Sequence, residues 1–283
     1  MRLAISNIAW DTTEDEALAM LLTRFRIDAI DVAPRKYFSE PALATDEDIV
    51  HIKNWWSDRG IEITGMQALL FGTSGLNIFG LPETQEAMLQ HLTAVCRIGA
   101  GLAAQRLVFG SPKNRDRTGL SDQKAMNMAV SFFRRLGDIA QSYNVVVCLE
   151  PNPACYGANF MTTSIETAQV VRQVNHPAIK MQLDTGVLTI NGEDPASLLQ
   201  DCRSLIGHIH ASEPDLLPLG DGGTDHDKVV DTLKQYLPNY LVTIEMLATQ
   251  NEPHLIAIER ALTVAVRYYR NIDILPYLKE GDY

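Results

Sequence analysis

The sequence predicts a single α/β domain built as a (β/α)8 TIM barrel. Eight short runs rich in β-branched and aliphatic residues alternate with longer stretches of helical period. Several of these runs are almost continuously apolar, as expected for parallel strands that are covered on both faces. The 283 residues also lack a Pro/Gly/Ser-rich linker or a change of composition. One domain over residues 1–283 therefore accounts for the chain.

The expected elements follow one another as strand and helix. The strands, in order, are RLAIS at 2–6, DAIDVA at 28–33, IEITGM at 61–66, RLVFG at 106–110, VVVCLE at 145–150, IKMQLD at 179–184, LIGHIH at 205–210 and LVTIEM at 241–246. Two helical stretches have the capping-box pattern at their start, Thr13 with Glu16 and Thr163 with Glu166. The longest helical stretch, residues 121–143, leads into the fifth strand. The final DILPYLKEGDY, residues 273–283, is expected to form a short appended tail.

Charge and composition narrow the choice of partners and compartment. The formal net charge is -11, and the acidic residues are scattered, which argues against a nucleic-acid-binding surface. The N-terminus lacks a signal-peptide core and no apolar run is long enough to span a bilayer, so a cytoplasmic protein without a membrane partner is expected. Four widely spaced cysteines indicate reduced thiols. A homo-oligomer is compatible with all of these features.

Polar residues end four consecutive strands in the second half of the chain: Glu150, Asp184, His210 and Glu245. In a (β/α)8 barrel the C-terminal strand ends form one rim, and active sites lie there. Any one of these residues alone would be read as a helix cap or an ion-pair partner. Three converging carboxylates, however, repel one another, whereas a divalent cation with one imidazole stabilises them. We therefore expect all four residues to bind one divalent metal ion.

Two further histidines are candidates for contacting the substrate. Alternation along the strand sends His208 to the same side as His210 but one layer deeper, beside the ligands or inside the barrel. His226 lies in the glycine-rich segment GDGGTDHDK after the seventh strand, from which it is a candidate for reaching the rim. Other candidates for the pocket wall follow the first and third strands, with ordinary packing as the alternative: Asn7, Trp10, Gln67 and Phe71.

A cationic segment, FGSPKNRDR, follows the fourth strand and carries Lys113, Arg115 and Arg117. At the rim of the barrel these side chains would hold a phosphate or carboxylate group of the substrate, because arginine binds such groups bidentately. The alternative is an ordinary charged loop in solvent.

The four strand ends, in the forms CLEPNP, QLDTG, HIHASEPD and TIEM, resemble the xylose isomerase-like TIM-barrel superfamily of sugar phosphate isomerases and epimerases. The resemblance covers essentially the whole chain. It implies a divalent metal held by Glu150, Asp184, His210 and Glu245. In the ketose 3-epimerase branch, it also implies that Glu150 and Glu245 act as an acid/base pair on opposite faces of the substrate.

Two positions depart from the ketose 3-epimerase pattern. That branch carries a histidine three residues after the strand-six aspartate and an arginine six residues after the strand-seven histidine, and both contact the sugar. Val187 and Leu216 stand at these positions here. The substrate is therefore expected to differ from a free ketohexose in shape, charge or reaction.

The sequence thus predicts a metal-dependent isomerase or epimerase that moves a proton on a small-molecule carbohydrate substrate through an enediolate. Its oxygen-rich ligand set favours Mn²⁺, Mg²⁺ or Co²⁺ and tolerates Zn²⁺. Three alternatives stay open: a lyase or dehydratase on the same scaffold, a hydrolase of the endonuclease IV type, and a non-catalytic barrel. The endonuclease IV group needs additional histidines on strands two and three, and this sequence has none there.

Overall fold

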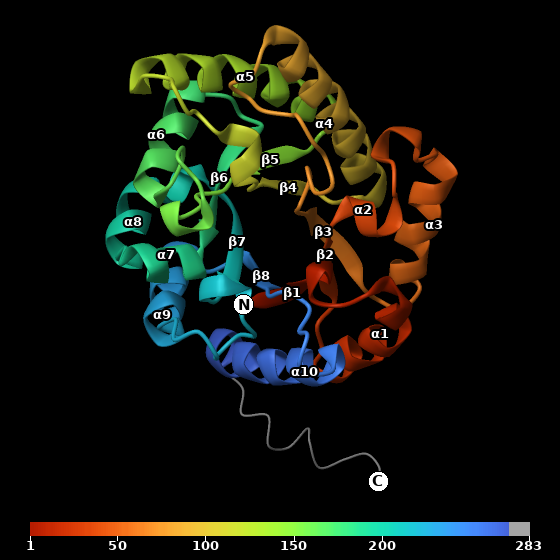
Figure 1. The fold of residues 1–283 in the computed structure, drawn as a ribbon. Coiled ribbons are helices and arrows are strands. Elements are labelled where there is room, and N and C mark those ends of the chain that lie inside the picture. Colours follow the sequence, from red (N-terminus) through yellow and green to blue (C-terminus); the bar gives the residue numbers. More distant parts are fainter. Residues whose placement is uncertain (272–283) are drawn as a thin grey trace.

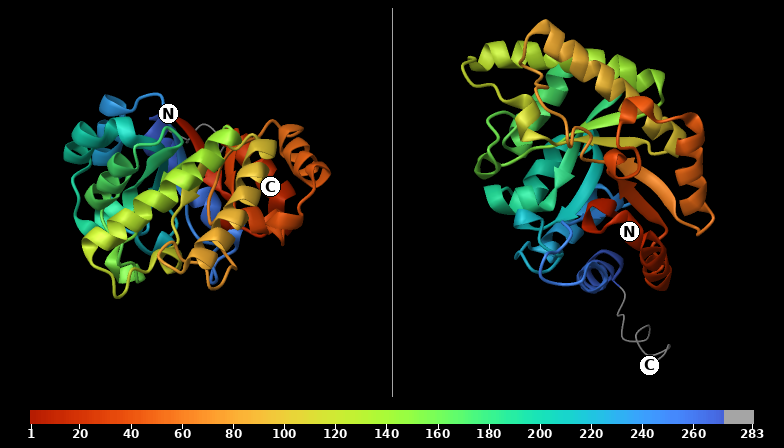
Figure 2. Two further views of the ribbon diagram at one scale, coloured as in Figure 1. Left: turned by 90° about the horizontal axis from the view of Figure 1, so that it is seen from above. Right: turned by 45° about the vertical axis from the view of Figure 1, so that its right-hand side comes forward.

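The structure is a computed structural model that describes residues 1–271. Eight parallel strands form a closed barrel in sequence order, and pairing of the first strand with the eighth completes the ring. Helices surround this ring on the outside (Figures 1 and 2). The prediction of a (β/α)8 barrel is confirmed. The expected tail at 273–283 lies outside the described residues.

The strands lie within one or two residues of their predicted positions. They are β1 (Arg2–Ser6), β2 (Ala29–Val32), β3 (Glu62–Met66), β4 (Arg106–Phe109), β5 (Val146–Leu149), β6 (Ile179–Asp184), β7 (Ile206–Ser212) and β8 (Leu241–Glu245). Most of their residues are buried, as expected for strands that face the barrel interior on one side and the helices on the other.

The described α-helices are α1 (Asp15–Arg24), α2 (Pro34–Tyr37), α3 (Asp46–Ser57), α4 (Pro82–Leu102), α5 (Asp122–Ser142), α6 (Ser164–Val174), α7 (Thr185–Asn191), α8 (Pro195–Cys202), α9 (His226–Tyr236) and α10 (His254–Ala265). A π-helix, Val266–Arg270, continues from α10. None of the helices in the described part of the chain is both long and apolar enough to cross a membrane.

The two predicted helix starts have different outcomes. Thr163 caps α6 by accepting the N–H of Glu166 at 3.1 Å, whereas the Glu166 carboxylate accepts the N–H of Thr162. The prediction of Thr13 as a cap is wrong, because a 3-10 turn already begins at Thr12 and places Thr13 inside it. Glu14 Oε2 accepts the N–H of Asp11 at this entrance instead.

Large apolar side chains between the strands and the helices hold the barrel rigidly. Phe109 of β4 meets Phe133 of α5 edge to face at 5.4 Å, and Trp10 meets Trp56 of α3 at 6.4 Å. Such aromatic pairs contribute packing energy beyond the area that they bury. The outer layer therefore fixes the strand ends, from which the candidate site is built.

Candidate metal and active site

The register of the last four strands brings the four predicted metal ligands together. Asp184 of β6 is the partner of His210 on β7, Ser212 of β7 is the partner of Glu245 on β8, and Glu150 directly follows β5. Ligand atoms of the three carboxylates and the imidazole all lie within 4.8 Å of one another. Asp184, His210 and Glu245 are buried and Glu150 is half-buried.

One nitrogen of His210 faces all three carboxylates. Its Nδ1 lies 3.1 Å from Glu245 Oε2, 3.4 Å from Glu150 Oε1 and 3.8 Å from Asp184 Oδ2. Glu150 Oε1, which faces His210 Nδ1, is buried and has no hydrogen-bond partner in the described part of the chain. Buried polar atoms rarely stay unsatisfied, and those that do call for a specific explanation, such as a bound ion. The donor set thus fits a divalent cation.

Burial and mutual repulsion make the cluster hold protons when no metal is bound. Burial, with the nearby charges of Glu245 and Glu150, raises the pKa of Asp184 to about 7. Burial opposes the charged form of His210, but the same two glutamates raise its pKa well above the ordinary value. Burial likewise opposes ionised Glu245, yet the neighbouring His210 leaves its pKa below the ordinary value.

Each carboxylate is held by one oxygen and turns the other toward His210. The holding contacts are Ser212 Oγ to Asp184 Oδ1 at 2.7 Å, Gln67 Nε2 to Glu245 Oε1 at 2.5 Å, and Asn152 Nδ2 to Glu150 Oε2 at 3.2 Å. Hydrogen bonds of this kind orient metal-binding side chains. Gln67 therefore lies at the site and orients Glu245 by this hydrogen bond. Ser212 was missed, although alternation in H-I-H-A-S places it on the face of His210.

Gly110 leaves the space that Glu150 occupies. A Cβ atom added at Gly110 would lie 1.9 Å from Glu150 Oε2, which real atoms never do. The residue ends the predicted fourth strand, and no sequence pattern indicates that the absence of its side chain accommodates the glutamate that follows β5.

His208 lies inside the barrel and is not at the rim. Its Nε2 is 2.7 Å from Asp31 Oδ2, and Gln182 lies between the two histidines, with its amide 2.9 Å from His208 Nδ1 and 3.0 Å from His210 Nδ1. The structure thus places His208 in contact with Asp31 and Gln182 inside the barrel, and not in the position that was expected for a substrate contact. Asp31 was missed, although an Asp flanked by apolar residues inside a strand, as in AIDVA, is a signal for a buried partner.

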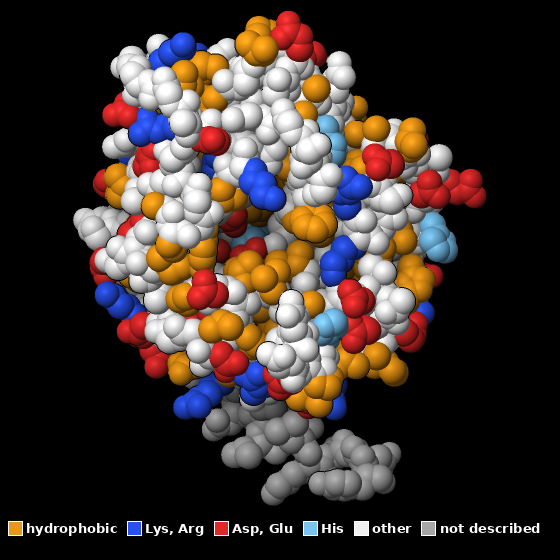
Figure 3. Space-filling model, in the orientation of Figure 1, with side chains coloured by type: hydrophobic (Ala, Val, Ile, Leu, Met, Phe, Trp, Pro, Cys, Tyr) orange, Lys and Arg blue, Asp and Glu red, His pale blue; other side chains and the backbone are white. Residues whose placement is uncertain are grey.

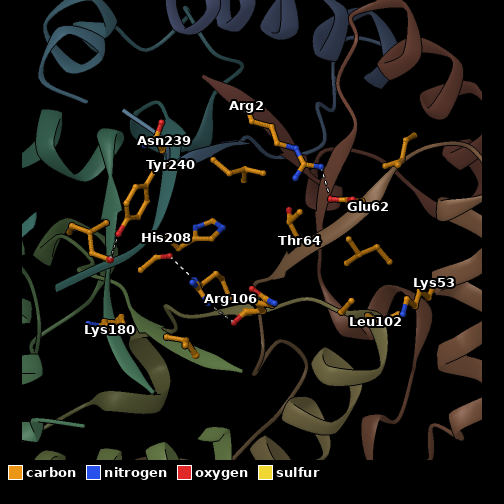
Figure 4. A pocket seen from close by; sticks show the side chains of 18 of the residues that line it. Arg2, Lys53, Glu62, Thr64, Leu102, Arg106, Lys180, His208, Asn239 and Tyr240 are labelled. Carbon is orange, nitrogen blue, oxygen red and sulfur yellow. Dashed lines mark hydrogen bonds and ion pairs between the residues drawn. The ribbon is translucent and has the colours of Figure 1, made fainter. Parts of the chain in front are cut away.

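A cavity of about 890 Å³ lies at the end of the barrel where the strands begin, which is opposite to the end that carries the four-residue cluster (Figure 4). His208 reaches it from the interior, and Arg2 and Arg106 border it. Arg2 pairs with Asp28 and Glu62, and Arg106 donates to the carbonyl of Gly207. The four-ligand cluster opens at the other end, where barrel enzymes carry their sites.

The cations of the segment after β4 do not line the cavity over the cluster. Arg115 is fully buried and donates from Nη1 to the carbonyl of Glu150 at 2.6 Å, and burial lowers its pKa to about 10. The residue is on a short 3-10 helix that turns it inward, which the spacing of the sequence did not reveal. Lys113 is exposed, and Arg117 pairs with Asp122. Arg115 thus supports the backbone of Glu150.

Three other candidates for substrate contact are buried behind the rim. Trp10 is fully buried and donates from Nε1 to Asp15 Oδ1 at 2.7 Å. Asn7 Oδ1 accepts the N–H of Ala33 at 2.7 Å. His226 Nε2 lies 3.0 Å from Glu213 Oε1, and its Nδ1 lies 2.9 Å from the hydroxyl of Tyr269. These contacts join loops to the barrel and place none of the three side chains at the cluster of Glu150, Asp184, His210 and Glu245.

A cavity of about 570 Å³ opens over the cluster and is bordered by Glu150, Glu245, Gln67 and Phe71. Figure 3 shows a hollow at this face of the barrel, with acidic side chains at its bottom and hydrophobic and cationic side chains around it. Phe71 is 72% exposed there. The arrangement can bind a metal ion and a small molecule side by side.

This chain matches one protein family, and its fold is similar to several solved structures. Residues 27–265 match the profile of a family described as xylose isomerase-like TIM barrel. The structure resembles D-psicose 3-epimerase with D-tagatose from Clostridium cellulolyticum H10, with a TM-score of 0.78 and 18% identity over 96% of this chain and 99% of that one. It also resembles 3-keto-D-glucoside 4-epimerase from E. coli, with a TM-score of 0.76 and 16% identity over 96% and 100%. A third similar structure, the IOLI protein with a bound zinc atom, has a TM-score of 0.75 and 18% identity over 96% and 99%.

Proposed function

This chain belongs to the xylose isomerase-like TIM-barrel family, and from that premise we propose that it is a metal-dependent epimerase or isomerase of a sugar or sugar derivative. The observation that carries the proposal is the convergence of three carboxylates and one imidazole within 4.8 Å at the C-terminal rim of the barrel. Similar solved structures are named as sugar epimerases, and one is named as holding zinc.

The residues that would hold the metal are Glu150, Asp184, His210 and Glu245. When bound, a divalent ion polarises a carbonyl and stabilises the negative charge that develops on oxygen as a proton leaves the adjacent carbon. The buried, unpartnered Oε1 of Glu150 supports this ligand set, as do the three carboxylates that repel one another without a cation. Mn²⁺, Mg²⁺ and Co²⁺ suit the oxygen-rich set, and Zn²⁺ is tolerated.

Glu150 and Glu245 are the proposed acid/base pair. Both border the cavity over the cluster, so both reach a molecule bound there. Gln67 holds Oε1 of Glu245, and a carboxylate held in this way at the cavity is able to accept a proton from a carbon next to a carbonyl. Return of a proton from the other glutamate to the opposite face of that carbon would invert its configuration. Return to the neighbouring carbon would move the carbonyl.

Isotope exchange and metal analysis test this proposal together. Protein purified without chelator is expected to contain one divalent ion per chain, and a panel of ketoses and keto-sugar derivatives in D₂O should yield an isomeric product that carries solvent deuterium. Loss of water from the substrate would identify a lyase instead. Absence of metal, with no exchange on any compound, would count against the proposal.

Glu245→Gln tests the proposed roles of Glu245 as metal ligand and as acid/base group, because it removes the charge and keeps the size of the side chain. Turnover should fall by roughly a hundredfold or more, in the range that a general acid or base contributes, while the barrel stays folded. Glu62→Gln is the matched control, because the Glu62 side chain is 68% exposed at the other end of the barrel. Unchanged turnover of Glu245→Gln would remove this residue from the acid/base pair.

A further inference from the structure

The cavity over the cluster is apolar along most of its wall. Its polar lining residues are Glu150, Glu245 and Gln67, which belong to or contact the cluster, together with Arg35, Lys36, Ser39 and Ser111. The apolar wall consists of Ile8, Leu70, Phe71, Val108, Leu216 and Leu247. A volume of about 570 Å³ falls within the roughly 300–1,000 Å³ of sites that hold drug-sized ligands. The site is therefore larger than a free sugar requires.

Large apolar side chains are left exposed where this cavity opens. Phe71 and Leu247, which both line the cavity, are 72% and 50% exposed. Scattered single apolar residues on a surface are ordinary. A group of them at the mouth of a cavity that leads to polar groups marks a ligand-binding site.

Leu216 is held in place at the cost of backbone strain. Asp215 and Leu216 have φ values of 60° and 52°, in the left-handed region that non-glycine residues rarely adopt. Asp215 donates its N–H to the hydroxyl of Tyr156 at 2.6 Å, and the carbonyl of Leu216 accepts the N–H of Leu247 at 2.9 Å. Persistent strain of this kind is typical of functional sites. It places Leu216 on the wall of the large cavity, beside the two glutamates.

A smaller cavity of about 140 Å³ adjoins the same site, and its lining mixes apolar with polar side chains. Leu216 borders both cavities, and Val187 and Ile190 line the smaller one together with Asp184 and Glu213. A hydroxyl group buried against leucine, valine and isoleucine would lose hydrogen bonds to water without replacement. A sugar with a hydroxyl on every carbon is thus poorly matched to the apolar wall of the larger cavity.

The cations near the cavity do not favour an anionic substrate. Arg35 donates to the carbonyl of Gly72 at 3.1 Å and faces Glu40 at 3.5 Å, and Lys36 donates to the carbonyl of Trp10. Both cations border the cavity but already hold protein oxygens. Their role in these contacts is to fix the loop after β2.

We propose that the substrate is a sugar derivative with an apolar substituent, such as an aromatic group linked through oxygen. Its oxygens next to the carbonyl lie at the glutamates, and its substituent lies between Phe71, Leu216 and Leu247. This inference rests on the proposed function, because it assigns the two glutamates of the cavity to the reacting carbons.

Two ketoses that differ only in their substituent test the inference. Titration calorimetry of the Mn²⁺-loaded protein with 6-O-benzyl-D-fructose and with 6-O-methyl-D-fructose should show the benzyl compound binding about tenfold more tightly or better, as burial of a phenyl ring predicts. Phe71→Ser and Leu216→Asn should bring the two dissociation constants together. Asn tolerates the left-handed backbone of position 216. Met20→Ser, which removes a 64% exposed apolar side chain from α1, is the matched control and should leave the preference intact.

The same samples in D₂O keep the two proposals apart. Equal affinity for both compounds, with deuterium exchange intact, overturns the apolar-substituent inference and leaves the proposed function standing. A preference that Phe71→Ser abolishes, without exchange on either compound, supports the apolar site and counts against the proposed reaction. A preference that survives both Phe71→Ser and Leu216→Asn overturns the placement of the substituent.

Discussion

At the scale of single residues, the four candidate ligands could be found from the sequence because each is a polar residue that ends an apolar strand. The residues that orient them were harder to find. Asn152 and Gln67 lie in loops, and their contacts with Glu150 and Glu245 depend on how those loops fold back. Arg115 shows the same limit, since the sequence gives its charge but not its burial.

Protonation of the cluster predicts an unusual pH dependence for metal-free protein. The pKa of Asp184 is raised to about 7 and that of His210 above its ordinary value, so between pH 5 and 7 the folded state binds more protons than the unfolded chain. The free energy of unfolding should therefore fall as pH rises, by roughly 2–4 kcal/mol over the full shift. Urea unfolding with chelator present measures it.

Asp184→Asn is the test of that cause, because it removes the carboxylate with the raised pKa and should flatten the slope. Glu245 and Glu213, whose pKa values are lowered, change stability only below their ordinary pKa and do not oppose the trend between pH 5 and 7. A metal-free protein that becomes more stable over this interval would contradict the prediction.

Gly110→Ala should weaken metal binding without unfolding the barrel. The added Cβ would lie 1.9 Å from Glu150 Oε2, so the glutamate must rotate away from His210. We expect the dissociation constant for Mn²⁺, measured by calorimetry, to rise about tenfold, as for changes in groups that orient ligands. Gly99→Ala in α4, whose Cβ would meet Leu107 at 3.1 Å, is the control and should leave it unchanged. Equal affinities in the two variants would show that Glu150 has room to adjust.

At the scale of elements, strands were predicted more accurately than the segments between them. An apolar run of β-branched residues is a local signal, and each predicted run contains its strand apart from the C-terminal extension of β7 to Ser212. The start of α1 was misplaced because a 3-10 turn precedes it, and the shape of the loop after β7 was not predicted. That loop depends on Glu213, which contacts residues 7 to 13 positions later.

Glu213→Gln should loosen the loop after β7 and weaken substrate binding. Glu213 is buried and accepts the N–H groups of Gly220 at 2.7 Å and Thr224 at 2.8 Å. Burial opposes its charge, but His226 and these donors lower its pKa to about 2. The variant's amide would turn a donor toward one of these N–H groups, at a cost of about 2 kcal/mol.

Hydrogen exchange is the direct measurement for this variant. The amides of Gly220 and Thr224 should exchange faster, and the Michaelis constant should rise because Leu216 loses its fixed position, while metal content stays at its original level. Glu252→Gln, at a partly exposed ion pair with Arg260, serves as control. Unchanged protection at Gly220 and Thr224 would show that other contacts hold the loop.

At the scale of the whole molecule, the architecture could be predicted from eight apolar runs and a uniform composition along the chain. The closed ring of strands explains why. A barrel has no edge strand, so every strand is buried on both faces and shows the same apolar signal. The two ends differ in a way that the sequence only partly revealed. The acidic cluster lies at the end of the strands, and the cavity bordered by Arg2 and Arg106 lies at their beginning.

Metal binding should stabilise the entire barrel, because the proposed ligands come from the four consecutive strands β5 to β8 and are assembled only in the folded chain. A ligand that binds the folded state alone stabilises it by about 2.7 kcal/mol at one hundred times its dissociation constant. For a chain of this size we expect the melting temperature to rise by roughly 5 °C or more when Mn²⁺ is added to chelator-treated protein. Calorimetric scans with Mn²⁺, Mg²⁺, Co²⁺ and Zn²⁺ measure the shift. Glu150→Gln should reduce it, whereas the control Asp46→Asn, at an exposed ion pair on α3, should show the full shift. If none of the four ions moves the melting temperature, the acidic cluster does not hold a metal, and its buried carboxylates must be neutralised by protons alone.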